Sequence, residues 1–291
     1  MNSFPIPVRM VGAGSHVEEE EMQYLDMPRD MRTFEMPRVP ERVDPRALIG
    51  ARDTLARFLA CMNGWQPGTG PNPRLDMRGL DSAALAITNE MLCDGEVSIQ
   101  VNGNRPLRIQ ESVFTGLWRI VELDGAGQLL ADWLEAAPLP AAVIDAARDG
   151  AAPGLAPVEI PAGAMNSPAL LQELHAQTRH RKAGAPPHVL NLTLFPMTPE
   201  DHQVLERALP VGNVAIISRG FGNCRVTSTK TRDIWRVQYF NSMNTLILNT
   251  IEVVDVPEVA LAAAEDLDDS RTRLEELIDW MSESCDDACE A

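Results

Sequence analysis

The fold is decided by the stretch Gly95-Glu-Val-Ser-Ile-Gln-Val-Asn-Gly103, which returns 117 residues later as Gly212-Asn-Val-Ala-Ile-Ile-Ser-Arg-Gly220. The alignment extends without a gap over 95–121 and 212–238. Seven residues of the first window have an identical partner in the second: Gly95, Val97, Ile99, Gly103, Arg108, Trp118 and Arg119. Average composition gives roughly one or two matches in such a window. The chain therefore contains a duplicated folding unit.

Around this repeat the pattern predicts helix, strand, helix and then three or four strands in each copy. Val97 and Ile99 alternate with polar residues, as in a strand with one buried face, and Asn102-Gly103 indicates a hairpin. Short connections between strands favour antiparallel pairing. The sequence thus predicts an α+β fold of two tandem homologous units, each a mostly antiparallel sheet flanked by helices.

The composition of the flanking segments gives the domain boundaries. Prolines forbid long helices over 1–45, which predicts an extended N-terminal arm, and Gly, Ala and Pro crowd together over 151–164. We expect an arm over 1–45, a first repeat over 46–150, a linker over 151–164, a second repeat over 165–270 and an acidic C-terminal helix and tail over 271–291. In the last segment Leu274, Leu277, Ile278 and Met281 recur at helical spacing.

Bulk properties limit the class of protein. The chain has 291 residues, 45% of them hydrophobic, and a net charge of −17, which argues against nucleic-acid binding. No apolar run is long enough to span a membrane, so we expect no membrane insertion. The N-terminus lacks a secretory pattern, and five cysteines at scattered spacings are typical of reduced thiols, so we expect a cytoplasmic location.

The charge is unevenly distributed. Residues 252–291 hold fourteen Asp and Glu against Arg271 and Arg273, whereas 207–232 holds five basic and no acidic residues. The acidic segment can be a solvated tail, or it can fold back onto the basic sheet of its own chain. One of the two charged regions can also dock a partner.

Catalytic and metal-binding signatures are missing from the sequence, so we expect no enzyme and no cofactor. The phosphate-binding, dinucleotide-binding and zinc-protease motifs are absent, and the five histidines are scattered. Cys224 is flanked by arginines, but it is in phase with Val226 and aligns with Leu107, which favours a buried thiol. Cys285 and Cys289 share a helical face, yet two thiolates do not complete a zinc shell.

The loop Gly220-Phe-Gly-Asn223 contains an aromatic residue that the first copy lacks. An aromatic side chain between two glycines can be an exposed anchor for a partner. Phe221 can equally well fold onto its own sheet, and both interpretations stay open.

Longer motifs in the second half resemble a known family. They are Asn191-Leu-Thr-Leu-Phe-Pro-Met-Thr-Pro-Glu-Asp201, Ser218-Arg-Gly-Phe-Gly-Asn-Cys-Arg-Val226, Ile234-Trp-Arg-Val-Gln-Tyr-Phe240 and Asn244-Thr-Leu-Ile-Leu-Asn-Thr-Ile-Glu-Val253. Together with Val11-Gly-Ala-Gly-Ser15 and Tyr24-Leu-Asp-Met-Pro28, they resemble the HupH/HyaF/HoxQ-type hydrogenase expression proteins. Ala13 stands where much of that family has proline.

The resemblance implies a maturation chaperone for an uptake-type, membrane-bound nickel–iron hydrogenase. Such a protein binds the precursor of the iron–sulfur small subunit before twin-arginine export, alongside a thioredoxin-like hydrogenase accessory protein. Our hypothesis is that the second repeat makes this contact, with five residues nearest to the partner: Phe221, Asn223, Arg225, Trp235 and Asn249. The alternative is an iron–sulfur or metal carrier that acts on the same subunit through Cys224, Cys285 and Cys289.

Overall fold

A computed structural model describes residues 44–220 and 223–290, with the side chains of 284–290 excepted. The expected N-terminal arm and Phe221 lie outside the described residues. Two compact units are present: one comprises 44–99, 104–142 and 261–290, and the other comprises 100–103 and 143–260. We call them the first and second units. Within the described residues, no helix is both long enough and apolar enough to cross a membrane.

The first unit has the predicted order of elements. They are α1 (Pro45–Met62), β1 (Arg74–Asp76), α2 (Ser82–Leu92), β2 (Val97–Val101), β3 (Leu107–Glu111), β4 (Leu117–Leu123) and β5 (Leu129–Ala136). The strands run in the order β1-β5-β4-β3-β2, and β1, β3, β4 and β5 pair antiparallel. Asp44 caps α1 and Asp81 caps α2 through side-chain bonds to backbone N–H groups.

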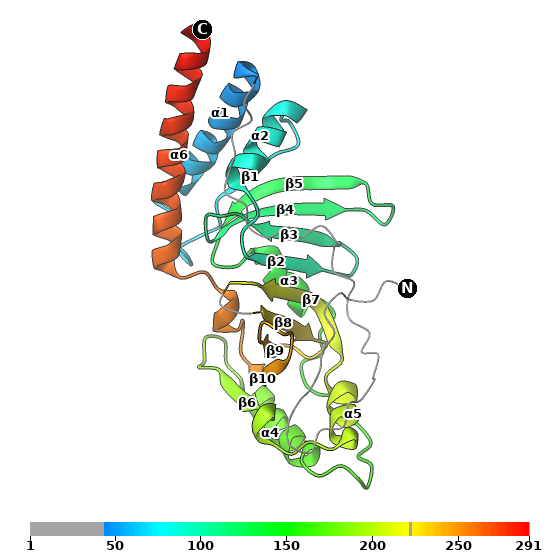
Figure 1. The fold of residues 1–291 in the computed structure, drawn as a ribbon. Helices are drawn as coiled ribbons and strands as arrows, with labels where there is room; N and C mark the ends of the chain where they lie inside the picture. Colours follow the sequence, from blue (N-terminus) through cyan, green and yellow to red (C-terminus); the bar gives the residue numbers. More distant parts are fainter. Residues whose placement is uncertain (1–43, 221–222, 291) are drawn as a thin grey trace. The chain divides into compact units, whose positions relative to one another are not determined.

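The core of the first unit also contains the C-terminal helix α6 (Ala264–Glu290). Leu274 and Met281 are buried against α1, with Leu277 and Ile278 partly buried beside them, so the predicted amphipathic helix is confirmed. Figure 1 shows α6, in orange to red, lying alongside α1. The helix begins earlier than the predicted residue 271, and its Leu267 packs against Gly116.

The second unit repeats this order. Its elements are α3 (Ala141–Arg148), α4 (Ser167–His180), β6 (His188–Asn191), the 3-10 turn η1 (Leu192–Leu194), α5 (Pro199–Ala208), β7 (Val211–Ser218), β8 (Asn223–Thr229), β9 (Ile234–Phe240), β10 (Leu246–Val253) and the 3-10 turn η2 (Glu258–Ala260). The strands run β7-β8-β9-β10-β6, antiparallel throughout. The α+β class with two homologous antiparallel units is confirmed.

Helices α4 and α5 close one core of the second unit. Leu170, Leu174 and Val204 pack there with side chains of β6, β9 and β10 (Leu190, Ile234, Ile251 and Val253). Strand β6 ends at Asn191, because the Asn191 side chain accepts a bond from the Thr193 N–H and the chain turns into η1. The residue ranges of arm, linker and tail stay predictions.

Asp201 joins the starts of both helices. Thr198 and Asp201 form a capping box on α5, and the other Asp201 oxygen, Oδ1, accepts bonds from the backbone N–H groups of Met165, Asn166 and Ser167 at 2.8–3.0 Å. The Ser167 hydroxyl donates a further bond at 2.8 Å. One buried carboxylate thus satisfies the N-termini of two helices.

The structure explains why Gly95 and Gly212 are identical in the two copies. A Cβ on Gly95 would lie 2.2 Å from the Ser112 carbonyl oxygen. A Cβ on Gly212 would lie 2.7 Å from the carbonyl oxygen of Thr229, the residue 117 positions after Ser112. In both copies a neighbouring backbone approaches too closely for any side chain.

Gly95→Ala and Gly212→Ala are each expected to lower the free energy of unfolding by about 2 kcal/mol, because a backbone has to shift to admit the methyl group. Urea denaturation measures the change. Gly125→Ala is the matched control, since a methyl group on Gly125 would point into open space, with no atom beyond its chain neighbours within 4 Å. A loss at Gly95 no larger than at Gly125 would contradict the explanation.

Candidate functional site

Three of the predicted contact residues lie together on one face of the second sheet. Arg225 on β8 pairs with Gln238 on β9, and Gln238 pairs with Asn249 on β10. Directly opposed residues of antiparallel strands share a face, so these side chains form a polar row. Asn223 is two residues before Arg225 and lies on the same face.

Most of this row is covered. Arg225 is only 8% exposed, and its guanidinium lies over the Phe240 ring at 5.6 Å from the centroid. Asn249 is also buried, whereas Asn223 is half-buried and its Nδ2 donates to Asn244 Oδ1 at 3.1 Å. In the first copy the counterpart of Arg225, Arg108, is exposed.

The hydrogen bond between Arg236 and Asn249 has an equivalent in the first copy, where the acceptor is a carboxylate instead of an amide. Arg236 Nε donates to Asn249 Oδ1 at 3.1 Å. At the equivalent positions, Arg119 Nε donates to Asp132 Oδ1 at 3.1 Å and Arg119 Nη2 to Asp132 Oδ2 at 2.8 Å. The second copy keeps the geometry but replaces the carboxylate with an amide.

Trp235 lies apart from the polar row. It pairs with Ser228 and Glu252, which places it on the opposite face of the sheet, and its indole N–H donates to the Asp255 carbonyl oxygen at 3.3 Å. The ring is buried and lines a small hollow together with Arg148, Asp233 and Asp255.

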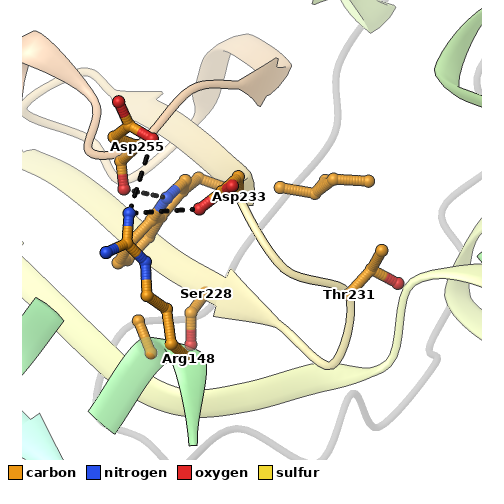
Figure 2. Close-up of a pocket in the computed structure, with 8 residues that line it drawn as sticks. Arg148, Ser228, Thr231, Asp233 and Asp255 are labelled. Atoms are coloured by element: carbon orange, nitrogen blue, oxygen red, sulfur yellow. Dashed lines mark hydrogen bonds and ion pairs between the residues drawn. The ribbon is translucent and has the colours of Figure 1, made fainter. Parts of the chain in front are cut away.

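The charged groups of this hollow are paired with one another. Figure 2 shows the Arg148 guanidinium directed at the carboxylates of Asp233, at 3.5 Å, and Asp255, at 3.4 Å. Asp255 also pairs with Arg181 at 3.3 Å and accepts from the Gly184 N–H. The arrangement is typical of a structural ion-pair network.

The sequence missed three exposed apolar side chains at the edge of the polar row. Leu194, Met243 and Ile247 are 77%, 79% and 55% exposed. Thr193 Oγ1 accepts from the Asn249 N–H at 2.9 Å, which holds η1 against β10. Alternation could not reveal Ile247, because a β-bulge between Leu246 and Leu248 interrupts the strand there.

Cys224 is buried, as predicted. Burial raises the pKa of its thiol to about 11, with the Glu252 charge adding to the rise and a bond with the Tyr239 hydroxyl opposing it. A thiol that stays protonated is a poor metal ligand. The side chains of Cys285 and Cys289 lie outside the described residues, and elsewhere in the described part of the chain no group of three or more His, Cys, Asp or Glu could hold a metal ion. Cys224 therefore does not favour the metal-carrier alternative.

Comparison with known proteins places the chain. Residues 63–156 and 164–281 match the family model of the HupH hydrogenase expression protein, C-terminal conserved region. The hydrogenase expression/formation protein HoxQ of Cupriavidus necator is 42% identical over 282 residues, which is 97% of this chain and 99% of that protein. The hydrogenase-1 operon protein HyaF of Escherichia coli is 35% identical over 223 residues, which is 75% of this chain and 77% of that protein.

A solved structure, the hydrogenase expression protein HupH from Thiobacillus denitrificans, aligns with 38% of this chain and 91% of its own length at 25% identity, with a TM-score of 0.33. The family model and the long alignments with HoxQ and HyaF agree with the motifs of the second repeat. The chain belongs to the HupH family of hydrogenase expression proteins.

Proposed function

We propose that this protein is a non-enzymatic maturation chaperone for an uptake-type, membrane-bound nickel–iron hydrogenase. In this proposal it binds the immature iron–sulfur small subunit in the cytoplasm, before twin-arginine export, and works with a thioredoxin-like accessory protein. The observation that carries the proposal is the alignment of 97% of the chain with a hydrogenase expression/formation protein.

The second unit offers the surface that such a role needs. Leu194, Met243 and Ile247 expose apolar area on hydrogen-bonded segments, and exposed apolar side chains on ordered segments are suited to binding another polypeptide. They adjoin the predicted contact residues Asn223 and Asn249. The proposal keeps Phe221 and Asn223 as direct contacts and gives the buried Arg225 and Asn249 the task of holding that face of the sheet in shape. Trp235, on the opposite face, has a structural role in this proposal.

Capture of the small-subunit precursor tests this function. The purified protein is expected to retain the precursor and to release it once the subunit has folded with its large subunit, because only the immature form exposes the segments to be bound. Mixing the protein with each form and measuring the complex by size-exclusion chromatography with mass detection decides the point. Equal binding to mature hydrogenase, or none to the precursor, would rule out the proposed chaperone role.

Substitution of the two residues proposed as direct contacts tests the contact face separately. Phe221→Ala combined with Asn223→Ala is expected to weaken precursor capture at least about tenfold. Arg108→Glu is the matched control, since Arg108 occupies an exposed position in the equivalent strand of the first copy. Unchanged capture by the double variant would remove this face from the proposal.

A further inference from the structure

The exposed apolar side chains of Leu194, Met243 and Ile247 belong to segments at one end of the second sheet, and we call them the apolar corner. Local hydrogen bonds fix the backbone beside the first two. Leu194 ends η1, which is fixed by the bond from the Asn249 N–H to Thr193 Oγ1. Met243 lies on the turn between β9 and β10, where Asn241 Oδ1 accepts from the backbone N–H groups of Met243 and Thr245, both at 2.9 Å. The corner is thus apolar and pre-organised.

The first copy builds the same turn with different chemistry. There Asp124 Oδ1 accepts from the N–H groups of Ala126 and Gln128, which are the residues 117 positions before Met243 and Thr245. Gly127 adopts φ +79° where Asn244 adopts φ +58°. The duplicated turn has gained a methionine and lost a carboxylate while its hydrogen bonds stayed the same.

The bulge on the last strand is duplicated too. Ile247 is skipped in the pairing of β10 with β9, and Leu130, its counterpart, is skipped in the pairing of β5 with β4. Both side chains are exposed. Because Leu129 and Leu130 expose apolar area on an equivalent bulge of the first unit, they supply a matched control for the apolar corner.

The two copies differ more in the number of charged residues than in backbone structure. Residues 95–137 contain six acidic and three basic side chains, whereas the equivalent residues 212–254 contain two acidic and five basic. Five carboxylates of the first copy are replaced by uncharged residues in the second: Glu96 by Asn213, Glu111 by Ser228, Glu122 by Tyr239, Asp124 by Asn241 and Asp132 by Asn249. Two of these changes, at Asn241 and Asn249, lie directly beside the apolar corner.

Arg236 brings positive charge to the same place. Its Nε bonds to Asn249 Oδ1, and the Asn249 backbone bonds to Thr193, next to Leu194. In the first copy the equivalent Arg119 pairs with the carboxylate of Asp132 at 2.8 Å. A surface on which amides replace two carboxylates beside an arginine attracts acidic groups more strongly than its counterpart in the first copy, and it repels basic ones.

We infer that the apolar corner docks an acidic segment of a partner polypeptide whose bulky apolar side chains cover Leu194, Met243 and Ile247. If the proposed function holds, this segment belongs to the immature small subunit, and the basic twin-arginine signal is excluded from this surface by like charge. The inference thus names the chemistry of the bound segment.

Two labelled peptides test the inference by fluorescence anisotropy. One has about twelve residues that alternate Glu with Leu and Phe, and the other has Lys in place of each Glu. The acidic peptide is expected to bind the full-length protein at least about tenfold more tightly at low salt, with a difference that shrinks as salt is added. Equal binding, or a preference for the Lys peptide, would overturn the inference.

Two sets of variants locate the binding. The triple change Leu194→Ser, Met243→Ser and Ile247→Ser is expected to weaken binding of the acidic peptide at least about tenfold, while Leu129→Ser with Leu130→Ser leaves it within about twofold. Asn241→Asp with Asn249→Asp restores the carboxylates that the same geometry already holds in the first copy, and it is expected to weaken binding of the acidic peptide about tenfold with the apolar corner intact. If neither set of substitutions weakens binding, the acidic peptide binds elsewhere and the inference about the apolar corner is wrong.

The peptide assay and the precursor assay test separate claims, so a negative result in one leaves the claim tested by the other intact. If wild-type protein discriminates between the peptides but never retains the precursor, the docking surface stands and the maturation role falls. If the precursor binds wild type and the triple variant equally, the maturation role stands and the apolar corner is not its surface.

Discussion

Replacing Asp201 with alanine is expected to lower the free energy of unfolding by about 4 kcal/mol, which is the largest effect of a single substitution that we predict. The change removes the acceptor for three backbone N–H groups at the start of α4 and one half of the capping box of α5. Buried donors left without a partner cost about 1–3 kcal/mol each, and loss of a cap costs about 0.5–2 kcal/mol.

The same substitution has a pH signature. Burial alone would raise the pKa of the Asp201 carboxyl, but bonds from Ser167, Thr198 and Asn166 outweigh it and hold the pKa well below its usual range. A depressed folded-state pKa contributes stability above the unfolded value of 3.8, and that stability is lost as the pH falls through the folded value. The difference between wild type and Asp201→Ala is therefore expected to be largest near neutral pH and to shrink below about pH 4.

Urea denaturation at several pH values measures both effects. Glu206→Ala, an exposed change on the same helix, is expected to alter stability by less than about 0.5 kcal/mol. Asp201→Asn keeps an acceptor oxygen and should fall between alanine and wild type. A loss below about 1 kcal/mol for alanine would mean that the two helix starts do not depend on this carboxylate.

Replacing Glu111 with glutamine is expected to stabilise the protein at pH 8 by about 2–3 kcal/mol and to have little effect at pH 4. Burial raises the pKa of Glu111 from 4.5 to about 7, with the charges of Glu96 and Asp266 adding to the rise and the bond from the Gly116 N–H opposing it. A glutamine oxygen can accept the same N–H, at 2.9 Å in wild type, without placing a charge there.

The direction in which stability changes with pH follows from the protons that the folded and unfolded states bind. The folded protein holds the Glu111 proton between about pH 4.5 and 7, where the unfolded chain has released it, so stability falls as the pH rises through that window and stays lower above it. Unfolding free energies of wild type, Glu111→Gln and the exposed control Glu206→Gln at pH 4, 6 and 8 measure the effect. Parallel pH profiles for wild type and Glu111→Gln would show that Glu111 does not titrate in this window.

The duplication let the sequence predict most of the fold. The spacing of 117 residues carries over to α2 and α5, whose first residues are Ser82 and Pro199, and to the strand that begins at Leu117 or Ile234. The turn at Asn102-Gly103 could be predicted because such signals act within a few residues. The packing of α6 against α1 joins residues more than 200 positions apart, and no local pattern contains that information.

The site was harder to predict, because strand alternation tells which residues share a face but not whether that face is covered. Strand alternation correctly placed Cys224 on a buried face. It placed Arg225 on the opposite face but could not show that Arg225 is buried as well. Trp235, separated from Arg225 by the same alternation, could not have joined it at one surface. Leu194 and Ile247 have the pattern of ordinary strand residues, and only a turn and a bulge reorient them.

The position of α6 also bears on the order in which the chain can fold during synthesis. Leu274 and Met281 complete a core to which Ala47 also contributes, so the unit whose described residues are made first lacks one of its helices until residues 264–281 have emerged. All of the second unit's helices and strands are synthesised before that point. Domains generally fold as their own residues become available, from the N-terminus onward. Here the half of the protein that is translated first is the half that is completed last.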